Sequence, residues 1–87
     1  QMTRSAALEL ARDNIRVNAL APGYIMTDLN RAFLQSEDGA RLAKKVPMRR
    51  FAAAEELSAA LIFLLDPQNS YMTGETLTID GGMGAGL

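Results

Sequence analysis

The spacing of apolar residues predicts one strongly amphipathic helix near the end of the chain, over residues 54–65. Its apolar positions recur at i, i+3, i+4, i+7 and i+8, the period of a helix with one buried stripe: Leu57, Ala60, Leu61, Leu64 and Leu65. Glu55 and Glu56 stand in the first turn, where negative charge complements the helix dipole. Asp66-Pro67 ends the helix.

A second helix and two strands follow from the same kind of pattern. Apolar residues cover a broad face over residues 2–12, which predicts a helix that ends at Asp13-Asn14. Ile15–Leu20 and Glu75–Asp80 instead alternate with period two, so we expect strands there.

The order of these elements predicts an α/β fold with one right-handed βαβ crossover from the first strand to the second. Parallel strands are usually covered on both faces and belong to larger sheets. We therefore expect this piece to be the closing edge of a larger domain. A chain that begins at Gln1, already in a helical pattern, looks cut from something longer.

The stretch from Thr27 to about residue 47 predicts a flap of short helical pieces. Thr27 or Asp28 is positioned to cap the first piece, and Ser36 the second. Gly39 lies between the pieces, and Pro47 follows them. Such short helices are marginal by themselves and open locally at low free energy, which suits a flap.

Pro22-Gly23 follows the first strand directly and predicts a turn that faces a ligand. Proline has no amide hydrogen for a sheet ladder, and glycine has no Cβ to keep another molecule away from the main chain. In open α/β sheets, ligands sit beyond the carboxyl ends of the strands. A plain surface turn is the alternative for a bare Pro-Gly pair.

Composition narrows the possible chemistry. A formal net charge of -1 gives no basic footprint for nucleic acid, and no segment is long and apolar enough for a membrane span or a signal peptide. The chain has no Cys and no His, which removes thiolate chemistry and the commonest general base. We therefore expect a soluble protein, and the lack of cysteine is compatible with the cytoplasm. Acidic residues beside the predicted caps fit helix termini better than catalysis or metal binding: Asp28, Glu37 and Asp38.

Taken together, several motifs resemble the C-terminal part of a short-chain dehydrogenase/reductase over almost the whole chain. They occur in this order: Ile15-Arg16-Val17-Asn18, Pro22-Gly23, Thr27, Gly74-Glu75 and Asp80-Gly81-Gly82. The resemblance implies the C-terminal βαβ portion of a Rossmann-type doubly wound parallel sheet. It also implies hydride transfer between NAD or NADP and a carbonyl or secondary alcohol, of 3-oxoacyl reductase or sugar-acid dehydrogenase type.

The resemblance assigns cofactor binding to the turn and substrate contact to the flap. The Ile25 backbone, after Pro22-Gly23, would bind the nicotinamide carboxamide, and the Thr27 hydroxyl would bind the same end of the cofactor. Helix capping is the alternative for Thr27. Leu29, Phe33 and Leu34 would line the substrate pocket, or alternatively hold the flap to the domain. The chain has no Tyr-x-x-x-Lys and no Gly-x-x-x-Gly-x-Gly, so we assign it no catalytic residue and expect it to be inactive alone.

Further expectations concern the partners of the protein and its alternative function. The resemblance pairs the last helix and strand with their copies in a homo-oligomer, a dimer or a homotetramer. A non-catalytic interaction or oligomerisation module of the same fold is the alternative function. The basic cluster Met48–Phe51 either meets a substrate anion or forms an exposed turn paired with Glu55 or Glu56.

Overall fold

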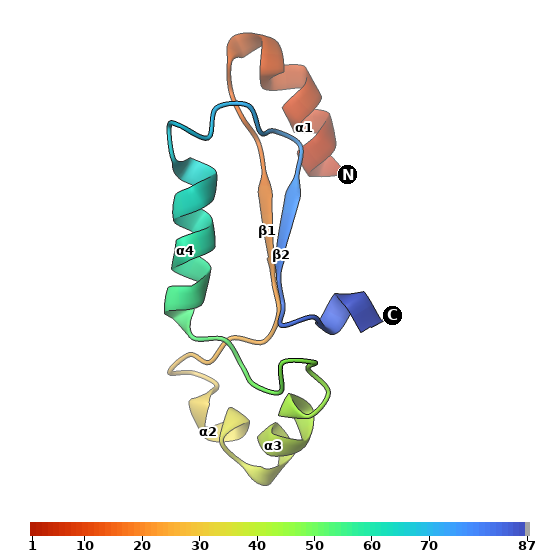
Figure 1. Ribbon diagram of the computed structural model, residues 1–87, viewed down its shortest axis with the longest axis vertical. Coiled ribbons are helices and arrows are strands. Elements are labelled where there is room, and N and C mark those ends of the chain that lie inside the picture. The colour runs from red at the N-terminus through yellow and green to blue at the C-terminus, as the bar shows by residue number, and fades with distance from the viewer. Residues whose placement is uncertain (87) are drawn as a thin grey trace.

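The computed structural model describes residues 1–86. Figure 1 shows two strands side by side, with helices around them and a helical pair at one end. The elements in chain order are α1 (Met2–Leu10), a 3-10 helix (Ala11–Asp13), β1 (Ala19–Pro22), α2 (Arg31–Leu34), α3 (Glu37–Ala43), α4 (Ala54–Leu65), β2 (Thr76–Ile79) and a second 3-10 helix (Met83–Gly86).

β1 and β2 form a two-stranded parallel sheet, which confirms the α/β class. The register runs from Ala19 opposite Thr76 to Pro22 opposite Ile79. The predicted first strand, Ile15–Leu20, therefore began and ended too early. Its first half is held by other bonds, because the Asn18 side chain binds the Met72 carbonyl and the Glu75 N–H.

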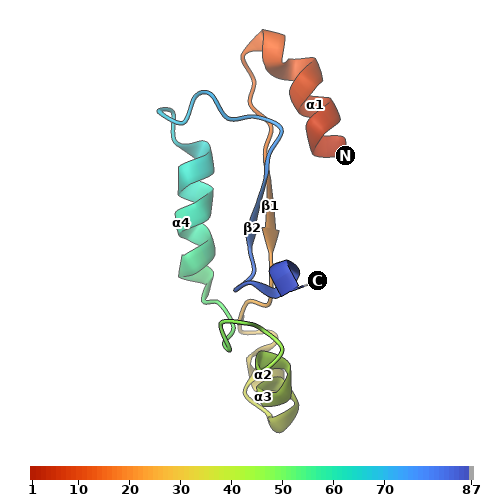
Figure 2. The same ribbon diagram turned by 45° about the vertical axis from the view of Figure 1, so that its right-hand side comes forward.

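The βαβ crossover passes through α4, which has the bounds that the sequence predicts. Two views 45° apart show α4 running alongside the strands, with α1 on the other side near the end where the strands begin (Figures 1 and 2). Ala7 of α1 is buried and lies at the start of β2, next to Gly74.

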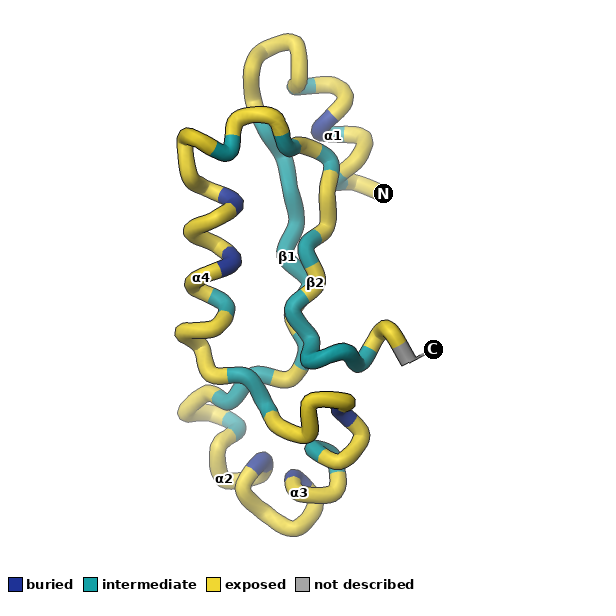
Figure 3. Tube along the Cα trace, in the orientation of Figure 1, coloured by how far each residue is buried: buried dark blue, intermediate teal, exposed yellow. Residues whose placement is uncertain are grey.

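Only part of the predicted α4 stripe is buried. Ala60 and Leu64 are buried, whereas Leu61 and Leu65 are 47% and 68% exposed. The burial view shows the buried positions on the side of α4 that faces the strands (Figure 3). Two strands are narrower than the apolar face of this helix, so within this chain the predicted buried stripe is covered only in part.

The helical pair α2 and α3 lies at the end where both strands finish (Figure 1). Ser36 caps α3 as predicted, with its Oγ accepting the Gly39 N–H at 3.2 Å. Gly39 itself lies inside α3 and not between the helices, which corrects the sequence prediction. Asn30, and neither Thr27 nor Asp28, is the residue that precedes α2.

The segment after β2 is also ordered by local hydrogen bonds. Residues 83–86 form a 3-10 helix, and the Asp80 carboxylate accepts the N–H groups of Gly82 and Gly84, both at 2.9 Å. These bonds lower the pKa of Asp80, and the bond from Gly84 has the largest effect. The carboxylate is therefore used to fix the turn after β2. Leu87 lies outside the described residues.

Candidate functional site

The turn that begins with the last residue of β1, over residues 22–27, lies at the carboxyl end of the sheet, as predicted. Gly23 extends the ladder, because its N–H donates to the Ile79 carbonyl at 2.9 Å. Ala19 donates in the same way to the Glu75 carbonyl, just before β2, so the N–H groups of alternate residues point to this neighbouring segment. Pro22 falls between them, so its lack of an N–H removes no hydrogen bond from this ladder.

A glycine is needed at position 23 for a structural reason that the sequence did not reveal. A Cβ on this residue would lie 2.8 Å from the Asp80 Cα and 2.9 Å from its Cβ. The space left by the missing side chain is therefore filled by the turn after β2. On this side, Gly23 lies against Asp80, so its lack of a Cβ is needed for this packing.

The backbone N–H and C=O of Ile25 point away from the neighbouring segment at Ala52. It forms a parallel bridge with Ala52, made by the Ala52 N–H to the Tyr24 carbonyl and the Met26 N–H to the Ala52 carbonyl, both at 3.0 Å. In such a bridge, the N–H and C=O of the central residue point to the opposite side. Within residues 1–86 the Ile25 N–H donates no hydrogen bond. One donor and one acceptor of the same residue thus share the edge that faces away from Ala52, here called the outward edge, and the acceptor already takes one bond from Asn30.

Asn30 is a site residue that sequence reasoning did not single out. Its Nδ2 donates to the Ile25 carbonyl at 2.9 Å, and its Oδ1 accepts the Thr27 N–H at 2.7 Å. An Asn before a short helix is normally assigned as a cap for that helix. No pattern in the sequence shows that this side chain bonds backward to the turn.

Thr27 is exposed and does not cap α2, so helix capping, the alternative role considered for Thr27, is wrong. It lines a groove of about 400 Å³ between the turn and the first turn of α4. The groove residues are Met26, Thr27, Asp28, Arg31, Ala53, Ala54 and Glu55. This volume is within the range of small-molecule sites, about 300–1,000 Å³.

The segment that bridges to Ile25 is tied to α4 by an ion pair. Arg50 donates two hydrogen bonds to the Glu56 carboxylate, at 2.7 and 2.8 Å, and the same carboxylate accepts the Ala53 N–H at 2.9 Å. The bonds from Arg50, followed by that from Ala53, lower the pKa of Glu56 to about 2. This confirms the alternative given for the basic cluster Met48–Phe51, a turn paired with Glu55 or Glu56.

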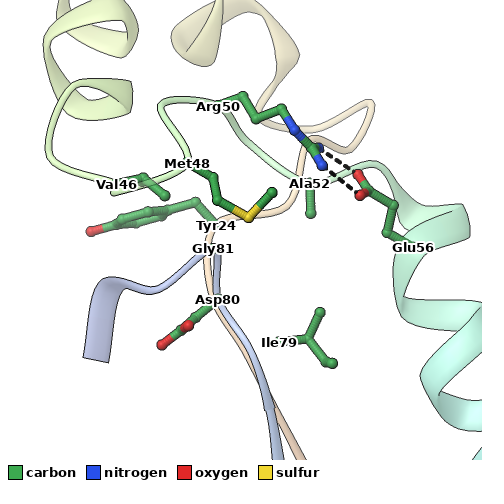
Figure 4. Close-up of a pocket in the computed structure, with 9 residues that line it drawn as sticks. All are labelled: Tyr24, Val46, Met48, Arg50, Ala52, Glu56, Ile79, Asp80 and Gly81. Carbon is green, nitrogen blue, oxygen red and sulfur yellow. Dashed lines mark hydrogen bonds and ion pairs between the residues drawn. The ribbon is translucent and has the colours of Figure 1, made fainter. Parts of the chain in front are cut away.

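A smaller pocket lies between this ion pair and the end of β2. Figure 4 shows Arg50 and Glu56 joined on one side of it, with Ile79, Asp80 and Gly81 on the other. Its volume is about 100 Å³, below the size of most ligand sites. Both carboxylates at its border, those of Glu56 and Asp80, are already hydrogen-bonded.

The three predicted substrate-flap residues differ in how far their side chains are buried. Leu34 is 7% exposed, whereas Leu29 is fully exposed and Phe33 is 53% exposed. Leu34 is therefore part of the packing of the flap, while the other two side chains are accessible.

Among residues 1–86, no group of three acidic side chains comes together as a metal site. No helix in this described range has the length and apolar character needed to cross a membrane.

A family model described as enoyl-(acyl carrier protein) reductase matches residues 1–84. The chain belongs to the short-chain dehydrogenase/reductase family. Glucose 1-dehydrogenase 2 of Bacillus subtilis is 45% identical over 82 residues, which cover 94% of this chain and 32% of that protein. A 3-oxoacyl-(acyl-carrier-protein) reductase of Salmonella typhimurium is 43% identical over 81 residues, which cover 93% of this chain and 33% of that protein.

Solved structures of this family superpose on nearly the whole chain. A short-chain dehydrogenase family protein of Francisella tularensis matches with a TM-score of 0.88 and 40% identity, covering 98% of this chain and 39% of that one. A putative 2-deoxy-D-gluconate 3-dehydrogenase of Agrobacterium tumefaciens, solved with bound NADP, matches with a TM-score of 0.86 and 33% identity, covering 97% and 35%. The chain is thus a Rossmann-type short-chain dehydrogenase/reductase segment that spans about a third of the length of its curated relatives.

Proposed function

We propose that the protein carrying this chain is an NAD(P)-dependent oxidoreductase that moves a hydride between a nicotinamide cofactor and a carbonyl or secondary alcohol. Within it, the turn with Pro22, Gly23, Ile25 and Thr27 holds the nicotinamide end of the cofactor. The observation that carries this proposal is the outward edge of Ile25, whose N–H has no acceptor within residues 1–86.

The residues of the turn fit a carboxamide. A carboxamide offers one acceptor oxygen and two N–H donors. The Ile25 N–H meets the first need, and the Ile25 carbonyl, which has a second lone pair beside its bond to Asn30, meets the second. The exposed Thr27 hydroxyl adds a group that both donates and accepts.

Fixing the carboxamide on two sides orients the ring, so that one face meets the substrate. When bound, the nicotinamide supplies or takes the hydride. The chain itself has no Tyr-x-x-x-Lys, so we assign proton transfer to residues outside it. The 87-residue polypeptide alone is expected to show no turnover.

For the substrate we propose a 3-oxoacyl group or a sugar acid, the two types suggested by the resemblance. The accessible Leu29 and Phe33 supply apolar flap surface beside the turn. Apolar side chains that close over a site exclude water from it. An acyl chain fits this surface directly, whereas a sugar acid needs polar partners from elsewhere in the protein.

We also propose that the protein is a dimer or tetramer that works in the cytoplasm. Ile62, Phe63 and Leu65 on α4 are 67%, 51% and 68% exposed. Apolar side chains gathered on one helix favour contact with another protein surface. This also supports the alternative function, a non-catalytic oligomerisation module of the same fold.

Titration of the full-length protein with NADH and NADPH separates the two functions. The oxidoreductase proposal predicts binding of at least one dinucleotide and its oxidation when a 3-oxoacyl thioester or a keto sugar acid is added. A protein that assembles into oligomers but binds neither dinucleotide would be the module instead.

A further inference from the structure

The Asn30 side chain is used in an unusual way for a residue that precedes a helix. Such a residue normally accepts an N–H from the first turn of the helix, which stabilises the helix. Asn30 makes no such bond to α2. Both ends of its carboxamide instead bond to the turn behind it, to the Ile25 carbonyl and the Thr27 N–H.

These two bonds determine the geometry of two successive peptide groups. The peptide between Ile25 and Met26 is held at both ends, since its C=O accepts from Asn30 and its N–H donates to Ala52. The next peptide is held through the Thr27 N–H. The distance and angle between the Ile25 edge and Thr27 therefore depend on the Asn30 side chain together with the bond to Ala52.

Asn30 is partly shielded from water at its bond to the Ile25 carbonyl, whereas its bond to the Thr27 N–H is exposed. It is half-buried, and the bond to Ile25 lies in a partly buried position. Hydrogen bonds that are shielded from water are stronger than exposed ones, and losing one partner leaves the other unsatisfied.

We propose that Asn30 is a positioning residue for the nicotinamide end of the cofactor, because it holds the Ile25 carbonyl and Thr27 at the spacing that a carboxamide needs. This inference depends on the proposed function. It adds a residue to that site which touches the turn and not the reacting atoms. A change at Asn30 should therefore alter the binding of the nicotinamide and leave the rest of the cofactor unaffected.

The test compares two ligands on the full-length protein. NAD(P)H contains the nicotinamide, whereas ADP-ribose, or its 2′-phosphate, lacks it. Asn30→Ala removes both bonds, and Asn30→Asp keeps the acceptor for Thr27 but places an acceptor against the Ile25 carbonyl. Asn69→Ala is the matched control, because Asn69 is also half-buried and donates to a main-chain carbonyl, that of Phe63 at 3.1 Å, but does not line the groove.

We expect both Asn30 variants to raise the dissociation constant of NAD(P)H about tenfold. This is the effect of losing about one hydrogen bond between the protein and the nicotinamide. ADP-ribose binding should stay unchanged, and Asn69→Ala should change the binding of neither ligand. Unchanged NAD(P)H binding in both Asn30 variants would overturn the inference. Equal weakening of both ligands would also overturn it, because Asn30 would then act through folding alone. If the unaltered protein binds ADP-ribose but not NAD(P)H, or binds neither, the proposed function itself fails.

Discussion

The substitution Gly39→Ala tests whether the flap is a tightly packed helical pair. In an ordinary helix interior, alanine is about 1 kcal/mol more favourable than glycine. Here a Cβ on Gly39 would lie 2.1 Å from the Leu34 oxygen, 2.4 Å from the Leu34 carbonyl carbon and 2.5 Å from the Phe33 oxygen. All three are backbone atoms at the end of α2, so α2 and α3 must move apart to accept it.

The size of the effect follows from two opposing terms. Overpacking costs about 1–3 kcal/mol, and contacts this short with main chain place the cost at the upper end. The gain in helix propensity offsets about 1 kcal/mol of it. We therefore expect Gly39→Ala to destabilise the flap by about 2 kcal/mol.

Hydrogen exchange of amides in α3 measures this local stability in the full-length protein. A loss of about 2 kcal/mol corresponds to protection lower by about 30-fold. Ala40→Gly is the matched control, because Ala40 is the exposed neighbour and loses only propensity, about 1 kcal/mol. If Gly39→Ala raises protection, helix propensity dominates and the close packing of α2 on α3 is refuted.

Three other substitutions in the full-length protein test the packing around the turn. Gly23→Ala should cost about 1–3 kcal/mol, because its Cβ meets the Asp80 main chain; an unchanged melting temperature would contradict this close approach. Ser36→Ala should cost the flap about 1 kcal/mol through the lost cap, seen as faster exchange of the Gly39 amide; equal exchange rates would refute the cap. Glu56→Gln should destabilise the protein at neutral pH. Because folding lowers the pKa of Glu56 from 4.5 to about 2, its contribution is complete above about pH 4.5 and is lost as the pH falls toward 2. Denaturant unfolding of both forms across this range should show a difference that shrinks with acid, and a constant difference would count against the ion pair.

Local patterns were sufficient to predict the elements with strong internal signals. The bounds of α4 follow from its apolar period and from Asp66-Pro67, and β2 falls within the predicted 75–80. Ser36 was identifiable as a cap because a cap acts within one helical turn. The turn at the carboxyl end of β1 followed from Pro22-Gly23 and the general placement of such turns.

The remaining features depend on partners distant in sequence. The bounds of β1 are set by its pairing with Thr76–Ile79, and no residue near Ile15 contains that information. Gly23 is explained by Asp80, which lies 57 positions further along the sequence. The exposure of Leu61 reflects a sheet of two strands beside a helix whose apolar face is wider. The backward bonds of Asn30 depend on the path of the turn, which no local pattern specifies.

The central proposal is that the outward N–H of Ile25 binds the nicotinamide carboxamide, and proline tests it most directly. Ile25→Pro deletes an N–H that has no acceptor within residues 1–86, while Ile25→Ala shortens the side chain and keeps the N–H. The measurement is the dissociation constant of NAD(P)H for both variants of the full-length protein, with ADP-ribose as a check on folding. We predict about tenfold weaker NAD(P)H binding for Ile25→Pro than for Ile25→Ala, with equal ADP-ribose binding. Equal NAD(P)H binding by the two variants would contradict the proposal.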